Sequence, residues 1–150
     1  MRELSLAGVY EIIPARFGDE RGFFTETWNR AALAAHGIDL DFVQDNHSLS
    51  VPVGTLRGLH YQTPPMAQDK LVRATRGRVF DVAVDLRPDS PTYRHWVSLV
   101  LDAANRRKQG SIVRRLTGRM KTIAATGPAG GAPAGDGGGV SCASAAPIVS

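Results

Sequence analysis

One histidine lies in a segment whose neighbouring side chains could bind and deprotonate a ligand. The segment Leu56–Gln62 reads Leu-Arg-Gly-Leu-His-Tyr-Gln, and Lys70 follows after a proline-containing loop. An imidazole has an unperturbed pKa of about 6.5, so a histidine side chain can take and return a proton near neutrality. The ammonium of Lys70 can stabilise an enolate oxygen. These residues make His60 a candidate general base, although a lone histidine in a strand is more often structural. If the strand is regular, residues 56, 58, 60 and 62 share one face, and Gly58 leaves space beside the imidazole for a ligand.

Two further polar clusters lie in otherwise strand-like stretches. The run from Asp19 to Glu26 contains Arg21, whose planar guanidinium fits a phosphate or a carboxylate. A hairpin turn with charged tips is the alternative explanation. Between Gln44 and Ser48, five consecutive side chains can form hydrogen bonds. Because alternate side chains of a strand face inward, some of them need a polar partner such as a sugar or a nucleobase. An Asx-rich turn would account for this second cluster equally well.

The elements that would position these residues are mostly short strands. Turn-forming Gly and Pro residues separate stretches rich in β-branched and aromatic residues, which is typical of an antiparallel sandwich or jelly roll. Asn29 can cap a short helix over residues 31–35, with Gly37 at its end. The pattern predicts strands at Val9–Ile13, Phe23–Trp28, Phe42–Ser50, Leu56–Gln62, Leu71–Ala74, Val79–Leu86 and Tyr93–Leu101.

Composition excludes several classes of protein. No stretch approaches the roughly 18–20 apolar residues of a membrane span, and the N-terminus lacks the basic start and apolar run of a signal peptide. The single cysteine rules out an internal disulfide framework and favours a cytoplasmic location. The chain has four histidines and no His-x-His pair, which does not fit the ligand spacing of a metal site, so we predict no metal.

The chain changes character after about residue 108. The net charge of +4 comes from a net of −2 over residues 1–105 and +6 over residues 106–150. Aromatic residues are absent after Trp96, and residues 124–150 are mostly Ala, Gly, Pro and Ser. Such a composition can bury little surface. We therefore expect an enzyme-like part at 1–108 and an atypical tail at 109–150, basic and then Gly/Ala-rich, that is disordered and leaves the jelly roll incomplete in its C-terminal half.

The three polar clusters, taken in order with the Lys-Leu-Val-Arg and Val-Phe-Asp-Val-Ala-Val-Asp-Leu-Arg segments, resemble the dTDP-4-dehydrorhamnose 3,5-epimerase family over about residues 8–107. The resemblance implies a cupin fold, a cytoplasmic homodimer and an isomerase of dTDP-L-rhamnose biosynthesis. Such an enzyme inverts C3 and C5 of a dTDP-4-keto sugar without a metal or other cofactor. By this resemblance His60 is the base and Lys70 supports the enolate oxygen. The substrate-binding positions implied in the same way are Arg21, Glu26, Gln44, Asp45, Asn46 and Arg57.

Part of the family's pattern is missing from this sequence. The family has a tyrosine acid, a further histidine and an orienting aspartate in its second half, and none occurs here in a corresponding context. We therefore expect little or no complete epimerisation. A non-catalytic fragment that binds a sugar nucleotide is the alternative. A nucleic-acid binder acting through the basic segment 106–121 is a third, less favoured reading, because that segment lacks aromatic residues.

Overall fold

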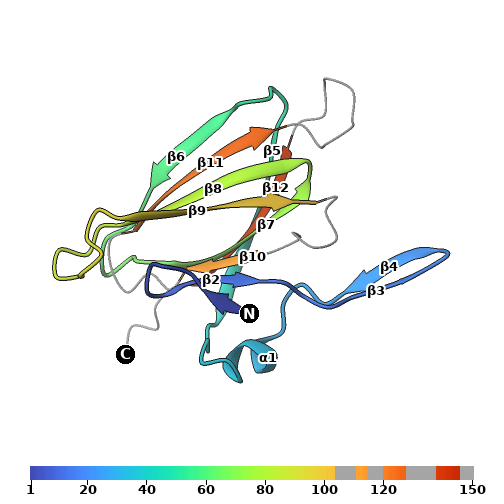
Figure 1. Cartoon of the computed structure of the whole chain (residues 1–150), viewed down its shortest axis with the longest axis horizontal. Coiled ribbons are helices and arrows are strands. Elements are labelled where there is room, and N and C mark those ends of the chain that lie inside the picture. The colour runs from blue at the N-terminus through green and yellow to red at the C-terminus, as the bar shows by residue number, and fades with distance from the viewer. Residues whose placement is uncertain (104–110, 115–119, 128–137, 146–150) are drawn as a thin grey trace.

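Antiparallel strands form almost all of the regular structure. The computed structural model describes residues 1–103, 111–114, 120–127 and 138–145 (Figure 1). Within these residues the one α-helix is α1 (Arg30–Ala34). The strands are β1 (Arg2–Glu3), β2 (Val9–Ile12), β3 (Arg16–Asp19), β4 (Gly22–Thr25), β5 (Phe42–Ser50), β6 (Leu56–His60), β7 (Asp69–Arg76), β8 (Arg78–Asp85), β9 (Trp96–Asp102), β10 (Ser111–Arg114), β11 (Met120–Gly127) and β12 (Gly138–Ala145).

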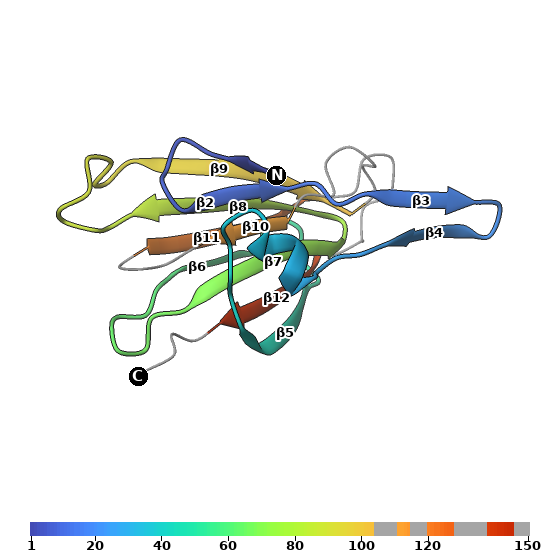
Figure 2. The ribbon, with the colours of Figure 1, turned by 90° about the horizontal axis from the view of Figure 1, so that it is seen from below.

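The strands are arranged in two main sheets and one hairpin. The six-stranded sheet has the order β1-β2-β10-β7-β12-β5, and the four-stranded sheet has the order β6-β11-β8-β9. All pairs are antiparallel. Strands β3 and β4 form a separate hairpin that projects away from both sheets (Figures 1 and 2). This architecture confirms the predicted all-β jelly roll.

Two apolar clusters hold these layers together. The first lies between the two sheets and joins β2 and β7 of one to β8 and β9 of the other; its buried members are Leu6, Val9, Val72, Val79, Ala83 and Leu101. The second lies on the outer face of the six-stranded sheet, where Leu71 packs with Leu33, Ile38 and Leu40 from α1 and the segment after it. The first cluster defines which face of each sheet is the inner one.

The short helix forms next to the predicted cap, with each end one residue earlier than the sequence predicts. The Asn29 side chain accepts a hydrogen bond from the backbone N–H of Ala32 at 3.1 Å. At the other end Gly37 takes a φ of +81°, which suits glycine. The backbone N–H of Ile38 donates to the carbonyl of Leu33 at 3.0 Å, and both side chains are buried in the outer cluster. No helix in the described ranges is long and apolar enough to cross a membrane.

Strand β8 buries the face that carries its acids. Val79, Asp81, Ala83 and Asp85 are buried, whereas Phe80 is 44% exposed on the opposite face. Asp85 is fully buried and accepts hydrogen bonds from Arg87 at 2.7 and 2.9 Å and from the hydroxyls of Ser90 and Thr92 at 2.6 and 2.7 Å. These bonds anchor the 85–95 turn to the end of the strand.

Three segments of the expected C-terminal tail are strands. Strand β10 pairs with β2 and β7, β11 pairs with β6 and β8, and β12 pairs with β5 and β7. Strands thus occur at three places within the segment for which we expect disorder. Sheet pairing uses the main chain, so an Ala-, Gly- and Ser-rich segment can pair without a side-chain pattern that a sequence would reveal. The rest of 109–150 lies outside the described residues, and the division of the chain at residue 108 stays a prediction.

Replacing the buried carboxylate of Asp85 tests how much it contributes to stability. We expect Asp85→Asn to lower the free energy of unfolding by about 3 kcal/mol, because Arg87 loses its charged partner in a poorly solvated position. Urea denaturation followed by circular dichroism measures the loss. The exposed Asp89 makes no ion pair within the described residues, and Asp89→Asn is the matched control. Equal stability of Asp85→Asn and the parent chain would contradict the expectation.

The same site predicts a pH dependence of stability. Hydrogen bonds from Arg87, and then from Ser90 and Thr92, hold the pKa of the Asp85 carboxyl well below its usual range, against the opposing effect of burial. A lowered folded-state pKa stabilises the fold above the unfolded pKa, roughly 3.9, and this contribution is lost as the pH falls further. The stability difference between the parent chain and Asp85→Asn should therefore be constant from pH 7 to 5. It should shrink below about pH 4, and a constant difference down to pH 3 would contradict the assignment.

Candidate functional site

A bulge in β6 sets the direction of the candidate base. Pairing with β11 runs Leu56↔Ala125, Arg57↔Ala124 and Gly58↔Ile123, and then skips one residue to His60↔Thr122. Leu59 is thus an extra residue opposite no partner, and Gly58 has a φ of +118°. The expectation that residues 56, 58 and 60 share a face is wrong, because the bulge moves His60 onto the face of Arg57.

That shared face is the inner one. Across β11, Arg57 is in register with Asp81, and His60 is in register with Ala83. Both partners on β8 are fully buried, and Ala83 belongs to the cluster between the sheets. Arg57 and His60 themselves are exposed, because β6 is the edge strand of its sheet. The two side chains therefore lie at an open edge of the interior.

The opposing sheet contributes polar residues to the same interior. Across β12, Gln44 is in register with Lys70, and Asn46 is in register with Val72 of the inner cluster. The amide of Gln44 donates to Oδ1 of Asn46 at 2.9 Å, as expected for residues two apart on one face. The structure thus places five of the predicted residues on the facing inner sides of the two sheets: Gln44, Asn46, Arg57, His60 and Lys70.

Arg57 connects the two edges of this opening. Strands β5 and β6 are the edge strands of different sheets and are joined by residues 51–55. The Nε of Arg57 donates to Oγ of Ser50 at 2.9 Å, and its Nη2 donates to the Leu49 carbonyl at 3.3 Å. Sequence reasoning missed Ser50. Continuing the alternation of Gln44 and Asn46 by four residues would have identified it as an inward polar group.

Three predicted binding residues lie elsewhere in this chain. Arg21 is in the turn of the projecting β3–β4 hairpin and forms an ion pair with Asp19. Glu26 follows the hairpin and accepts a hydrogen bond from the Asn29 amide at 3.0 Å. Asp45 is in register with Leu71 and so lies on the outer face of the six-stranded sheet. The structure does not bring these three residues to the inner face with His60.

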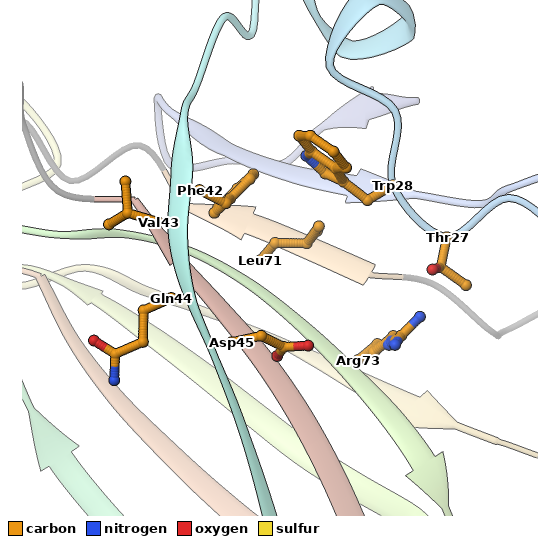
Figure 3. A pocket seen from close by; sticks show the side chains of 8 residues that line it. All are labelled: Thr27, Trp28, Phe42, Val43, Gln44, Asp45, Leu71 and Arg73. Carbon is orange, nitrogen blue, oxygen red and sulfur yellow. The ribbon is translucent and has the colours of Figure 1, made fainter.

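A cavity of about 360 Å³ lies on that outer face (Figure 3). Trp28 and Phe42 form part of its wall, with ring centroids 6.2 Å apart in an edge-to-face arrangement. Figure 3 shows Asp45 and Arg73 on one side of the β5 ribbon and Val43 and Gln44 on the other. Arg73 and Trp28 were not predicted as site residues, because nothing in their sequence context separates them from ordinary strand and linker residues. The full lining is Thr27, Trp28, Phe42, Val43, Gln44, Asp45, Leu71 and Arg73.

Strand β8 carries two buried aspartates, which differ in their position relative to His60. The buried Asp81 is on the inner face. Across β11 it is in register with Arg57, two residues along β8 from Ala83, which is in register with His60. Asp85 is held by Arg87, Ser90 and Thr92, so its role is structural. No group of three or more His, Cys, Asp or Glu residues with a geometry suited to a metal ion occurs within the described ranges.

Comparison with known proteins relates this arrangement to a family of sugar-nucleotide enzymes. The family model for dTDP-4-dehydrorhamnose 3,5-epimerase matches residues 3–110. A curated relative of that name from Sinorhizobium fredii is 52% identical over 104 residues, which are 69% of this chain and 53% of the relative. Another from Pseudomonas aeruginosa is 55% identical over 106 residues, which are 70% of this chain and 58% of the relative. The chain thus spans about half the length of the curated relatives it matches.

Solved structures agree with this comparison. A dTDP-4-dehydrorhamnose 3,5-epimerase from Bacillus anthracis with TDP and PPi bound has a TM-score of 0.85 and 34% identity, covering 97% of this chain and 77% of that one. A related epimerase from Legionella pneumophila, in complex with dTDP-4-keto-L-rhamnose, has a TM-score of 0.82 and 32% identity, covering 97% of this chain and 70% of that one. The chain shares sequence motifs and the jelly-roll fold with these proteins. It therefore belongs to the dTDP-4-dehydrorhamnose 3,5-epimerase family.

Proposed function

We propose that this chain binds dTDP-4-dehydro-6-deoxy-glucose between its two sheets and performs there the deprotonation step of an isomerase of dTDP-L-rhamnose biosynthesis, with His60 as the base. One observation carries the proposal: His60 and Arg57 of one sheet face the same interior as Lys70, Gln44 and Asn46 of the other. The nucleotide and sugar ligands named for the Bacillus and Legionella relatives support the substrate class.

The chemistry follows from the ketone of the substrate. A carbonyl at C4 acidifies the hydrogens on C3 and C5, because the carbanion left by deprotonation is delocalised onto O4. The neutral imidazole of His60 takes the proton, and the ammonium of Lys70 stabilises the negative charge on O4. Arg57 offers a planar cation for the diphosphate, while Gln44 and Asn46 offer hydrogen bonds to the sugar or the base. These steps use side chains alone and need no cofactor.

Inversion also requires a proton donor on the opposite face of the sugar. The chain has only three tyrosines: Tyr10, Tyr61 and Tyr93. Tyr10 packs against the outer cluster, and Tyr93 lies in the 85–95 turn beside Arg94. Tyr61 directly follows His60 on the same chain segment. If neither these tyrosines nor a second copy of the chain supplies an acid on the opposite face, the proton that His60 removes returns to the side from which it came. We therefore propose exchange with solvent in place of efficient epimerisation.

The second candidate is a non-catalytic protein that binds sugar nucleotides. The absence of the family's tyrosine motif favours it, since the binding residues of the inner face are present and the acid is not. The two candidates differ in whether the C3 and C5 hydrogens of bound substrate exchange with solvent.

Deuterium exchange tests the role of His60. We expect the purified chain in D₂O to incorporate deuterium at C3 or C5 of the keto sugar. His60→Asn should slow this incorporation by roughly a hundredfold or more, because the base is lost. Mass spectrometry and proton NMR measure the incorporation, and His95→Asn, at an exposed turn position, is the matched control. Binding without exchange supports the non-catalytic candidate, whereas normal conversion to the epimerised sugar refutes the proposed lack of an acid.

The proposed assembly is a cytoplasmic homodimer. The projecting hairpin exposes Phe17, Phe23 and Phe24 at 67%, 53% and 70%, a surface that a second copy would cover. The single cysteine suits a reducing compartment. Sedimentation equilibrium should give twice the chain mass. The double substitution Phe17→Ser and Phe24→Ser should give the mass of one chain, and an unchanged mass would exclude the hairpin as the interface.

A further inference from the structure

We infer that Ser50 is a positioning residue: it orients the guanidinium of Arg57 toward the diphosphate of a bound nucleotide. The inference rests on the proposed function and assigns a role to a residue outside the predicted site. Ser50 is the last residue of β5 and is 4% exposed, although it lies beside an open edge of the interior. Its hydroxyl oxygen accepts the Nε–H of Arg57 at 2.9 Å.

The geometry of the guanidinium determines which of its edges is free for a ligand. Nε and Nη2 form one of the two edges that can bind an oxyanion in a bidentate way, and here this edge donates to Ser50 and to the Leu49 carbonyl. The other edge is formed by Nη1 and Nη2, and its two N–H groups that point away from the first edge are available to donate hydrogen bonds. A phosphate can therefore bind the second edge while the first stays anchored to β5.

The charge of Arg57 is also preserved by these partners. A hydroxyl and a carbonyl are neutral, so they fix the side chain without neutralising its positive charge. Within the described part of the chain no carboxylate pairs with Arg57. By contrast, Arg21 and Arg87 each have an aspartate partner. Arg57 is thus held in place by neutral groups and can give its full charge to an anionic ligand.

The backbone alone does not fix this arrangement. Strands β5 and β6 belong to different sheets and share no ladder, so a free arginine would sample many rotamers across the opening. Immobilising such a side chain on binding has an entropic cost, which preorganisation by Ser50 reduces. Ser50 therefore acts through Arg57 and does not itself touch the ligand.

A double-mutant cycle for dTDP binding, measured by isothermal titration calorimetry, tests the inference. We expect Ser50→Ala to weaken dTDP binding by about five- to tenfold, the effect of losing one neutral hydrogen bond. In an Arg57→Gln background the same substitution should have no further effect, because Ser50 acts only through Arg57. Thymidine, which lacks the phosphates, should bind all four proteins equally. Ser98→Ala, on the outer face of the four-stranded sheet, is the matched control.

The possible outcomes separate the inference from the proposed function. A wild-type chain without measurable dTDP affinity overturns both. If the wild type binds dTDP but the effects of Ser50→Ala and Arg57→Gln are additive, only the role of Ser50 is overturned. The same holds if Ser50→Ala weakens thymidine binding as much as dTDP binding. If Ser50→Ala does not fold, as judged by circular dichroism, Ser50→Cys keeps the size of the side chain but supplies only a weak acceptor. It should give the same coupled loss, and unchanged dTDP affinity in a folded Ser50→Cys would contradict the inference.

Discussion

The alternation of side chains along a β-strand is the constraint on which the site depends, because each residue must face either the space between the sheets or the outside. In β5 it separates neighbours that the sequence presents as one polar cluster: Gln44 and Asn46 face inward, whereas Asp45 faces the outer cavity. In β6 strict alternation would separate Arg57 from His60. The extra residue at Leu59 reverses this. The bulge therefore places His60, the candidate base, on the same face as Arg57, the candidate diphosphate-binding residue.

The interior that results is polar at one end and apolar at the other. Val9, Val72 and Val79 close it near the centre of the sheets, while the edge strands bring amide, imidazole and guanidinium groups to the opposite end. Polar groups in such a space need partners. Asp85 and Ser50 have theirs within the chain, and the exposed side chains at the edge can use water or a ligand. The buried Asp85 thus serves the fold, whereas the exposed polar side chains at the edge are available for binding.

Much of the fold and part of the site could be predicted from sequence. The strand Phe42–Ser50 and the capped helix after Asn29 were predicted because turn residues, β-branched residues and a capping asparagine act locally. The register of β6 could not be predicted, since a bulge depends on pairing with β11, a segment without a readable pattern. The same reason hid strands β10–β12. The separation of Asp45 from Gln44 follows from a period of two, but which face is inner depends on the packing of distant segments.

The link between Arg57 and β5 has a mechanical consequence for the entrance to the interior. The two edge strands are joined there by one short connection and two side-chain hydrogen bonds, not by a sheet ladder. Widening the entrance breaks those two bonds, roughly 1–3 kcal/mol in total, and leaves every ladder intact.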